Sequence, residues 1–195
     1  MRWTIKPKPD LNKVARLSKE LGVDTITSFL LIQRGIETFE AAKNFFRPSL
    51  KDLHDPFLMK DMEKAVARIE KAILNKENIL VFGDYDVDGT TSVALVSSYL
   101  LTYYPNVATY IPDRYDEGYG ISYKGIDFAE DNNFSLIIAL DCGIKAIDKV
   151  DYASKKGVDF IICDHHRPGA NIPNAKAVLD PKRDDCNYPF KELCG

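Results

Sequence analysis

The sequence has few of the features that mark secreted, membrane-spanning or zinc-binding proteins. Its four cysteines form no Cys-x-x-Cys pair, and Cys186 and Cys194 have no further metal ligands nearby in sequence, which argues against a structural zinc site. No apolar run approaches the roughly 20 residues of a membrane-spanning helix. The basic N-terminal segment lacks the apolar core of a secretory signal. A cytoplasmic protein without disulfides is therefore the expectation.

The chain also lacks an excess of positive charge. It has 26 basic and 29 acidic residues, which gives a net charge of -3. This balance does not predict nucleic-acid binding, but it does not exclude it, because an acidic metal site lowers the total and local charge decides phosphate binding. The 195 residues suffice for one solid domain or for one domain with an appendage, and a hydrophobic content of 45% is ordinary for a globular protein.

The hydrophobic pattern changes near residue 76. Before it, caps and helical spacing predict helices at about 10–21, 24–35, 38–47 and 59–74. After it, short apolar runs predict strands at 79–82, 107–111, 135–140, 158–163 and 175–179, with helices at 90–101, 122–132 and 145–156. We therefore predict a helical N-terminal region, 1–76, and an α/β domain, 77–195, in which helices cover both faces of a mostly parallel sheet.

Three of the predicted strands run directly into acidic or imidazole side chains. These side chains are Asp84, Asp86 and Asp88 after the first strand, Asp141 after the third, and Asp164, His165 and His166 after the fourth. Ligands of open parallel sheets bind beyond the carboxyl ends of the strands. We therefore expect all three groups to meet in one pocket.

Each group also has a structural alternative. A single Asp after a strand often caps the next helix, and Asp141 taken alone fits that role. Three Asp residues at every second position of an extended segment, as in Asp84–Asp88, instead point to one side and favour metal binding. Adjacent His residues are seldom structural, because two buried imidazoles need two sets of hydrogen-bond partners.

Oxygen-rich ligands with one or two imidazoles suit Mn²⁺ or Mg²⁺ better than zinc. Clustered carboxylates repel each other unless cations neutralise them, and their number suffices for the two-metal arrangement used in phosphoester hydrolysis. The predicted metal ligands are Asp84, Asp86, Asp88, Asp141, Asp164 and His165. Asp141 is a candidate to bridge two ions. Whichever of His165 and His166 does not bind metal could contact the phosphate or protonate the leaving group, so both join Asp141 as catalytic candidates.

Two further segments are candidates for substrate binding. The loop 112–120 offers Arg114 and Tyr119 beside the predicted pocket, and Arg167 directly follows the two His residues. The alternative is an ordinary glycine-rich surface loop and a solvated arginine. Both interpretations stay open at this point.

These motifs resemble those of the DHH phosphoesterase superfamily, which is named for the triplet seen here at Asp164-His165-His166. GDYDVDGTTS resembles its first motif and ALDCG its second. The segments LLIQRGIETFEAAKNFFRPSLKDLHDPFLMKDMEKAVARI, IPDRYDEGYGIS and LDPKRDDCNYPFKELCG further resemble the RecJ family of single-stranded-DNA-specific 5′→3′ exonucleases.

The resemblance implies Mn²⁺- or Mg²⁺-dependent hydrolysis of single-stranded DNA from its 5′ end, in recombination and repair. It implies single-stranded DNA as the partner, with a single-stranded-DNA-binding protein and a helicase as candidate protein partners and no membrane. It also implies that a further metal-binding Asp, a DHHA1 domain and an OB-fold follow these residues. We therefore expect an N-terminal fragment that cuts poorly alone.

Two other functions are compatible with the metal motifs. One is a DHH phosphoesterase that acts on oligonucleotides, cyclic dinucleotides or pyrophosphate; the helical N-terminal region and the EGYG loop argue against it. The other is a non-catalytic DNA-binding scaffold, which would be expected to have lost metal ligands that are present here.

Overall fold

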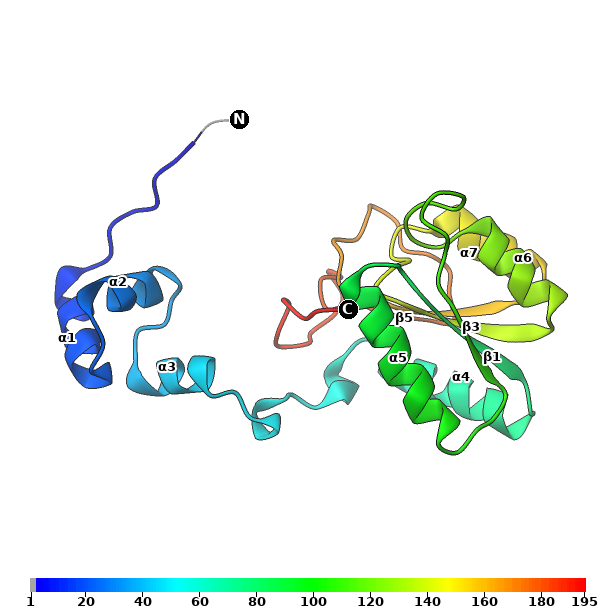
Figure 1. Cartoon of the computed structure of the whole chain (residues 1–195), viewed down its shortest axis with the longest axis horizontal. Coiled ribbons are helices and arrows are strands. Elements are labelled where there is room, and N and C mark those ends of the chain that lie inside the picture. Colours follow the sequence, from blue (N-terminus) through cyan, green and yellow to red (C-terminus); the bar gives the residue numbers. More distant parts are fainter. Residues whose placement is uncertain (1–2) are drawn as a thin grey trace. The chain divides into compact units, whose positions relative to one another are not determined.

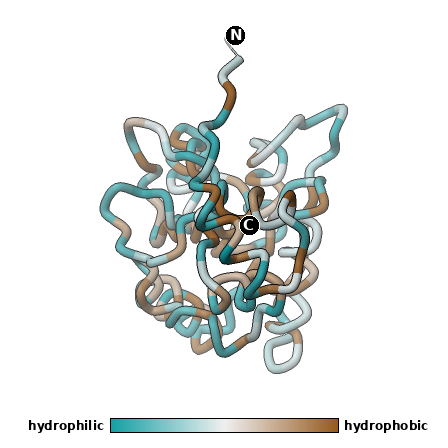
Figure 2. Tube along the Cα trace, turned by 90° about the vertical axis from the view of Figure 1, so that its left-hand side faces the viewer, coloured by the Kyte–Doolittle hydropathy of each residue, from teal (hydrophilic) through white to brown (hydrophobic). Residues whose placement is uncertain are grey.

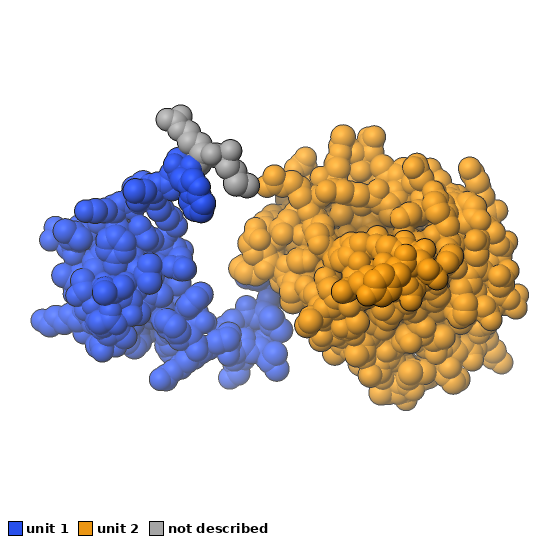
Figure 3. Space-filling model, turned by 45° about the horizontal axis from the view of Figure 1, so that its top comes forward, with its two compact units in different colours: residues 1–54 blue, residues 55–195 orange. Residues whose placement is uncertain are grey.

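The computed structural model describes residues 3–195, which divide into two compact units. The first unit ends at His54, and the second comprises Asp55–Gly195 (Figure 3). Among the described residues, no helix is both long and apolar enough to cross a membrane. Along the Cα trace, apolar residues come in short runs that hydrophilic residues interrupt (Figure 2).

The first unit is a small helical body whose helices begin at the predicted caps. It contains α1 (Leu11–Leu21), α2 (Thr25–Gln33), α3 (Phe39–Phe46) and the 3₁₀ turn η1 (Leu50–Asp52). The side chains of Asp10, Asp24 and Thr38 each accept a backbone N–H of the first turn, which satisfies donors that a helix start leaves unpaired. Its small core consists of Val14, Leu17, Leu31 and Ile32.

The second unit alternates strands and helices as the sequence predicts. Its elements are η2 (Pro56–Leu58), α4 (Met62–Leu74), β1 (Asn78–Gly83), α5 (Val87–Leu101), β2 (Val107–Tyr110), α6 (Tyr123–Asp131), β3 (Phe134–Leu140), α7 (Ile147–Lys155), β4 (Asp159–Cys163) and β5 (Ala177–Leu179). The five strands form one sheet in the order β2-β1-β3-β4-β5, and every neighbouring pair is parallel. The predicted α/β fold with a parallel sheet is therefore confirmed.

Helices cover both faces of the sheet (Figure 1). Successive side chains of a strand point to opposite faces. Accordingly, Ile79 and Val81 of β1 join one core with residues of α4 and α5. Leu80 and Phe82 of the same strand join the other core with residues of α6 and α7. Burial on both faces explains why these strands read as continuous apolar runs rather than alternating ones.

The helix α4 belongs to the second unit. Ala65 and Ala72 of α4 are buried in the same core as Leu179 of β5, and the helix packs against that strand. The helical region predicted for residues 1–76 is thus shared between the two compact units. The predicted start of the α/β domain at residue 77 stays a prediction.

The chain turns tightly between β1 and α5, at two glycines. A Cβ on Gly89 would lie 2.6 Å from both the backbone nitrogen and the backbone oxygen of Asp84. A Cβ on Gly83 would lie 2.8 Å from the carbonyl oxygen of Gly89. These distances are too short for any side chain, so the first turn of α5 can approach the end of β1 only because both residues are glycine.

Replacing Gly89 with alanine should therefore lower the stability of the second unit. The added methyl group meets backbone atoms that cannot move without shifting α5, and such overpacking costs about 1–3 kcal/mol. Urea unfolding followed by circular dichroism measures this loss. Gly169→Ala is the matched control, since its nearest neighbour would lie at an ordinary 3.6 Å. Equal stability of the two variants would contradict the close approach.

Candidate metal centre

Four aspartates occupy equivalent positions at one edge of the sheet. Gly83 pairs with Leu140, Leu140 with Cys163 and Cys163 with Leu179, so β1, β3, β4 and β5 end in register. The first residue beyond each strand is an aspartate: Asp84, Asp141, Asp164 and Asp180. All four are buried, with at most 5% of their surface exposed. The chain winds in opposite directions from β1, so the strand order reverses between β1 and β3, and ligands of parallel sheets bind at such a reversal.

Asp84 and Asp164 use their carboxylates to fix loops. Asp84 accepts the backbone N–H of Tyr85 and of Gly120, each at 2.7 Å, which ties the loop after β2 to the end of β1. Asp164 accepts three backbone N–H groups, those of Ile144, His165 and His166. Burial favours a raised pKa for Asp164, but these hydrogen bonds outweigh it and lower the pKa. Burial is the main cause that raises the pKa of Asp84.

Asp141 is the aspartate whose two carboxylate oxygens accept no hydrogen bond from the described residues. Its backbone lies in the left-handed region, at φ 60°, which is uncommon for a residue other than glycine. Its side chain is 1% exposed, yet no donor within residues 3–195 makes a hydrogen bond to either carboxylate oxygen. Burial, followed by repulsion from Asp88 and Asp86, raises its pKa to about 6. Leaving a buried carboxylate unpaired is costly, so the arrangement calls for a cation.

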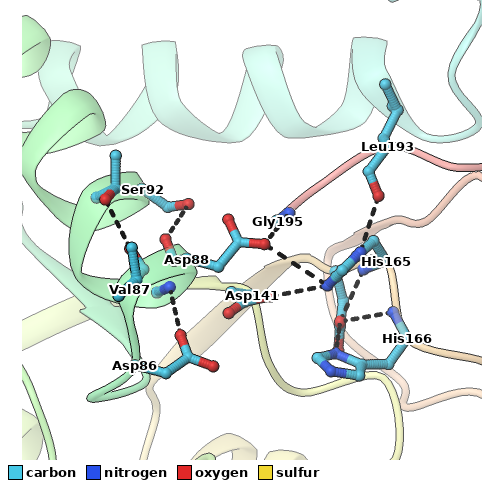
Figure 4. Close-up of polar contacts among 12 residues, drawn as sticks. Asp86, Val87, Asp88, Ser92, Asp141, His165, His166, Leu193 and Gly195 are labelled. Atoms are coloured by element: carbon cyan, nitrogen blue, oxygen red, sulfur yellow. Dashed lines mark hydrogen bonds and ion pairs between the residues drawn. The ribbon is translucent and has the colours of Figure 1, made fainter.

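His165 faces the same space with its Nε2 atom. Its Nδ1–H donates to the carbonyl oxygen of Leu193 at 2.8 Å, which directs Nε2 toward the cluster (Figure 4). This Nε2 lies 3.1 Å from Oδ1 of Asp141 and 3.9 Å from Oδ2 of Asp88. A backbone carbonyl that orients a ligating imidazole through its other nitrogen is common in metal sites.

These atoms fit a divalent cation. Two neighbouring ligands of an octahedral ion, each about 2.1 Å from it, lie about 3 Å apart. The 3.1 Å between Nε2 of His165 and Oδ1 of Asp141 matches that spacing. Two electron-rich atoms at this distance repel unless a proton or a cation lies between them. Ligand atoms of Asp141, His165 and His166 all lie within 4.8 Å of one another.

The helix α5 brings Asp86 and Asp88 toward this cluster. Asp86 caps the helix by accepting the N–H of Gly89 at 2.9 Å, and its other oxygen accepts the hydroxyl of Tyr119 at 2.9 Å. Asp88 lies in the first turn of the helix and accepts the N–H of Gly195 at 3.0 Å. The expectation that 84–88 stays extended, with the helix beginning at Thr90, is wrong, because the cap at Asp86 starts α5 at Val87.

His166 is held at the border of the cluster. Its Nδ1–H donates to Oδ1 of Asp164 at 2.7 Å, so Nε2 stays available to a ligand or a proton. Burial works to lower the pKa of His166, but the hydrogen bond to Asp164 outweighs it and raises the pKa. His166 is partly exposed, unlike the carboxylate of Asp164 that orients it. This geometry suits a proton donor beside a metal site.

The candidate substrate residues fall into two groups. Arg114 lies over the ring of Tyr85 at 4.6 Å, and Tyr85 packs edge-on against Tyr119 at 5.5 Å. The first two candidates, Arg114 and Tyr119, thus belong to one exposed aromatic cluster beside Asp86. Arg167 instead lines a separate cavity, together with Lys182. Among the described residues, that cavity does not include Asp141.

Sequence reasoning missed several residues at this edge. Asp180 is wholly buried, and burial raises its pKa, but it follows a strand of only three residues. The position of Leu193, whose carbonyl orients His165, has no sequence signal at all. Lys145 and Lys149 line a pocket beside Asp141, and their only signal was their place directly after the ALDCG segment.

Comparisons with known proteins identify the family to which these motifs belong. Residues 78–195 match the model of the DHH family, N-terminal domain. The chain is 42% identical over 195 residues to the single-stranded-DNA-specific exonuclease RecJ of Bacillus subtilis, an alignment that covers 100% of this chain and 25% of that protein. It is 29% identical over 182 residues to RecJ of Thermus thermophilus, covering 91% of this chain and 25% of that protein.

Solved structures give the same likeness. The structure of RecJ from Thermus thermophilus in complex with Mn²⁺ matches with a TM-score of 0.68 and 25% identity, over 93% of this chain and 25% of that one. A crystal structure of exonuclease RecJ bound to manganese matches with a TM-score of 0.62 and 30% identity, over 68% of this chain and 34% of that one. The chain spans about a quarter of the length of the curated relatives it matches.

Asp141→Asn in the metal-free chain should reveal the cost of the buried carboxylate. Because the folded state raises its pKa to about 6 from 3.8, the folded state holds the proton more tightly, and stability falls as the pH rises between those values. The shift corresponds to about 3 kcal/mol. We expect the variant to be about 1–3 kcal/mol more stable than the original at pH values above about 6, with no gain below about pH 4.

Urea unfolding in a chelator across this pH range measures the difference. Asp151→Asn is the matched control, since Asp151 is an exposed aspartate of α7. A difference between Asp141→Asn and the original chain that stays constant with pH would contradict the assignment.

Proposed function

The chain belongs to the DHH family, and from this premise we propose that it binds Mn²⁺ or Mg²⁺ and serves the hydrolysis of single-stranded DNA from the 5′ end. The observation that carries the proposal is the buried carboxylate of Asp141, without a hydrogen bond among residues 3–195, whose Oδ1 lies 3.1 Å from Nε2 of His165. The relatives named above are single-stranded-DNA-specific exonucleases, which supports the choice of substrate.

We assign the metal ligands from the side-chain atoms that converge beside Asp141. Asp141, His165 and Asp88 direct oxygen or nitrogen atoms into one space, and Asp86 adjoins it. The number of carboxylates suits two ions, which activate water and neutralise charge on the phosphoryl group when bound. The oxygens of Asp84 and Asp164 already accept backbone N–H groups, so we propose that these two residues position the loops around the metals. Their predicted role as direct ligands stays a prediction.

We propose further roles for four residues beside the metal cluster. His166 serves proton transfer, and the group of Tyr85, Tyr119 and Arg114 serves to orient the DNA. The ring of His166, fixed by Asp164, presents Nε2 at the cluster and can donate a proton to the leaving oxygen. The half-buried ring of Tyr85, with Arg114 stacked on it, and the exposed ring of Tyr119 offer bases a surface on which to stack. Stacking on such a surface requires unpaired bases, which accounts for a preference for single strands.

Partners and location follow from the substrate as further parts of the proposal. A single-stranded-DNA-binding protein and a helicase are the partners that would supply single strands, and the cytoplasm is where such DNA would be met. The competing proposal, a DHH phosphoesterase for oligonucleotides, cyclic dinucleotides or pyrophosphate, would use the same metals. It differs in substrate length, which an assay can separate.

Metal binding should be measurable without any reaction. Mn²⁺ relieves the repulsion around Asp141 in the folded state only, so a 100-fold excess over its dissociation constant should stabilise the chain by about 3 kcal/mol. Thermal unfolding with increasing Mn²⁺ measures this stabilisation. Asp141→Ala and His165→Ala should each remove most of it, whereas Asp151→Asn should retain it. Full Mn²⁺ stabilisation of Asp141→Ala would refute the assigned ligands.

Activity is best tested in the setting of a full-length relative. In a hybrid, the 195 residues replace the matching quarter of the Bacillus subtilis exonuclease, with which they share 42% identity. We expect the hybrid to degrade a 5′-ended single-stranded oligonucleotide with Mn²⁺, and Asp141→Ala to lower the rate at least about 100-fold, because the carboxylate contacts the reacting centre. The control is the hybrid with Asp151→Asn.

Three results would count against the proposed function. They are an inactive hybrid, undiminished cleavage by Asp141→Ala, and equal cutting of duplex and single strands. Rapid hydrolysis of dinucleotides with no attack on longer strands would favour the competing phosphoesterase.

A further inference from the structure

A pocket of ≈ 370 Å³ adjoins the metal cluster on the side of α6 and α7. Three segments line it: the loop after β2 with Tyr119, the loop from β3 into α7 with Lys145, and the segment after β4 with His166. Asp141 also borders the pocket, so a molecule bound there would lie next to the cations. Its volume falls at the lower end of the range of small-molecule sites.

Two lysines of this pocket have no carboxylate partner among the described residues. Lys145 is exposed, and Lys149 is half-buried with its Nζ 5.9 Å from the centre of the Tyr123 ring. Lys156, at the C-terminal end of the same helix, instead forms ion pairs with Asp127 and Glu130. The ammonium groups of Lys145 and Lys149 thus stay available to bind an anion from solution.

The acidic side chains that border the pocket do not prevent an anion from binding there. Asp164 is compensated by backbone donors and by the ring of His166. Asp141 points toward the proposed cations, which neutralise it. With metals bound, the remaining charge of the pocket is therefore positive, which favours a phosphate group.

The rest of the lining is apolar. Ile121 and Ile144 are buried below the pocket, and the ring of Tyr119 is 53% exposed at its rim. An inorganic anion would make no use of these walls, whereas a nucleotide offers a phosphate to the lysines and a flat ring to the tyrosine. Aromatic rings bind bases by stacking without regard to sequence.

We propose that Lys145 and Lys149 form a subsite for the phosphate of a single nucleotide, whose base lies against Tyr119. The assignment to DNA rests on the proposed function, in which this nucleotide is the one adjoining the cleaved bond. The subsite itself is defined by the pocket and its lysines.

The test measures binding without a reaction. Thymidine 5′-monophosphate has no phosphodiester bond to cut, so its affinity for the Mn²⁺-loaded chain, measured by calorimetry, is independent of hydrolysis. We expect the double variant Lys145→Gln with Lys149→Gln to bind it at least about tenfold more weakly, because charge-assisted contacts are lost. Binding of thymidine, which lacks the phosphate, should be the same in both proteins.

Matched variants separate charge from structure. Lys155→Gln removes an exposed lysine of α7, the helix that carries Lys149, and should leave the affinity for thymidine 5′-monophosphate unchanged. The double variant Lys145→Arg with Lys149→Arg keeps both charges and should retain most of the affinity. An unchanged affinity of the glutamine variant would overturn the subsite, as would an equal loss for thymidine. Inorganic phosphate binding as tightly as the nucleotide would overturn the assignment to a nucleotide.

The outcome is distinguishable from that of the activity test. Intact nucleotide binding with an inactive hybrid enzyme would remove the proposed hydrolysis and keep the subsite. Activity that depends on Asp141, together with unchanged nucleotide affinity in the glutamine variant, would remove the subsite alone.

Discussion

The site depends on the register of four parallel strands, which places four buried aspartates at one level of the sheet. Neighbouring strands lie about 4.8 Å apart, so the fold itself brings these carboxylates together. Each loses hydration, and each repels the next. The backbone hydrogen bonds of Asp84 and Asp164 relieve this repulsion at two of the four positions. The fold therefore creates a demand for positive charge before any ligand binds.

The aspartates are compensated in different ways. Two of them hold loops in place, whereas Asp141 keeps its oxygens available for a metal ion. Asp84 binds the N–H of Gly120 and thereby fixes the loop that carries Tyr119. Asp164 fixes both His residues and the N–H of Ile144. Asp141 alone retains two oxygens without hydrogen bonds among residues 3–195. A metal bound there would offset the cost of burying the unpaired carboxylate of Asp141. Because Asp84 and Asp164 hold the loops around the site, metal affinity and loop order are coupled.

The sheet could be predicted from the sequence because its central strands, β1, β3 and β4, are buried on both faces and therefore appear as continuous apolar runs. The clusters at the strand ends follow from the same rule. The prediction of an extended segment was wrong at Asp86, because its side chain accepts the N–H of Gly89 and the helix begins at the next residue. The place of α4 could not be read either, since an apolar helix face does not say what it packs against. Asp180 and the two pocket lysines lack periodicity, and only tertiary contacts reveal them.

Tyr119 connects the metal cluster to the neighbouring pocket. Its hydroxyl donates to Oδ2 of Asp86, and its ring lines the pocket. Burial, followed by the hydrogen bond to Asp86, raises the pKa of Tyr119, so the hydroxyl remains a donor at neutral pH. A cation bound to this oxygen of Asp86 would compete with the hydroxyl for it. A base stacked on the ring would in turn fix its position and so alter the competition at Asp86. Because linkage is reciprocal, any effect of pocket occupation on metal affinity would be matched by an equal effect of metal binding on pocket affinity.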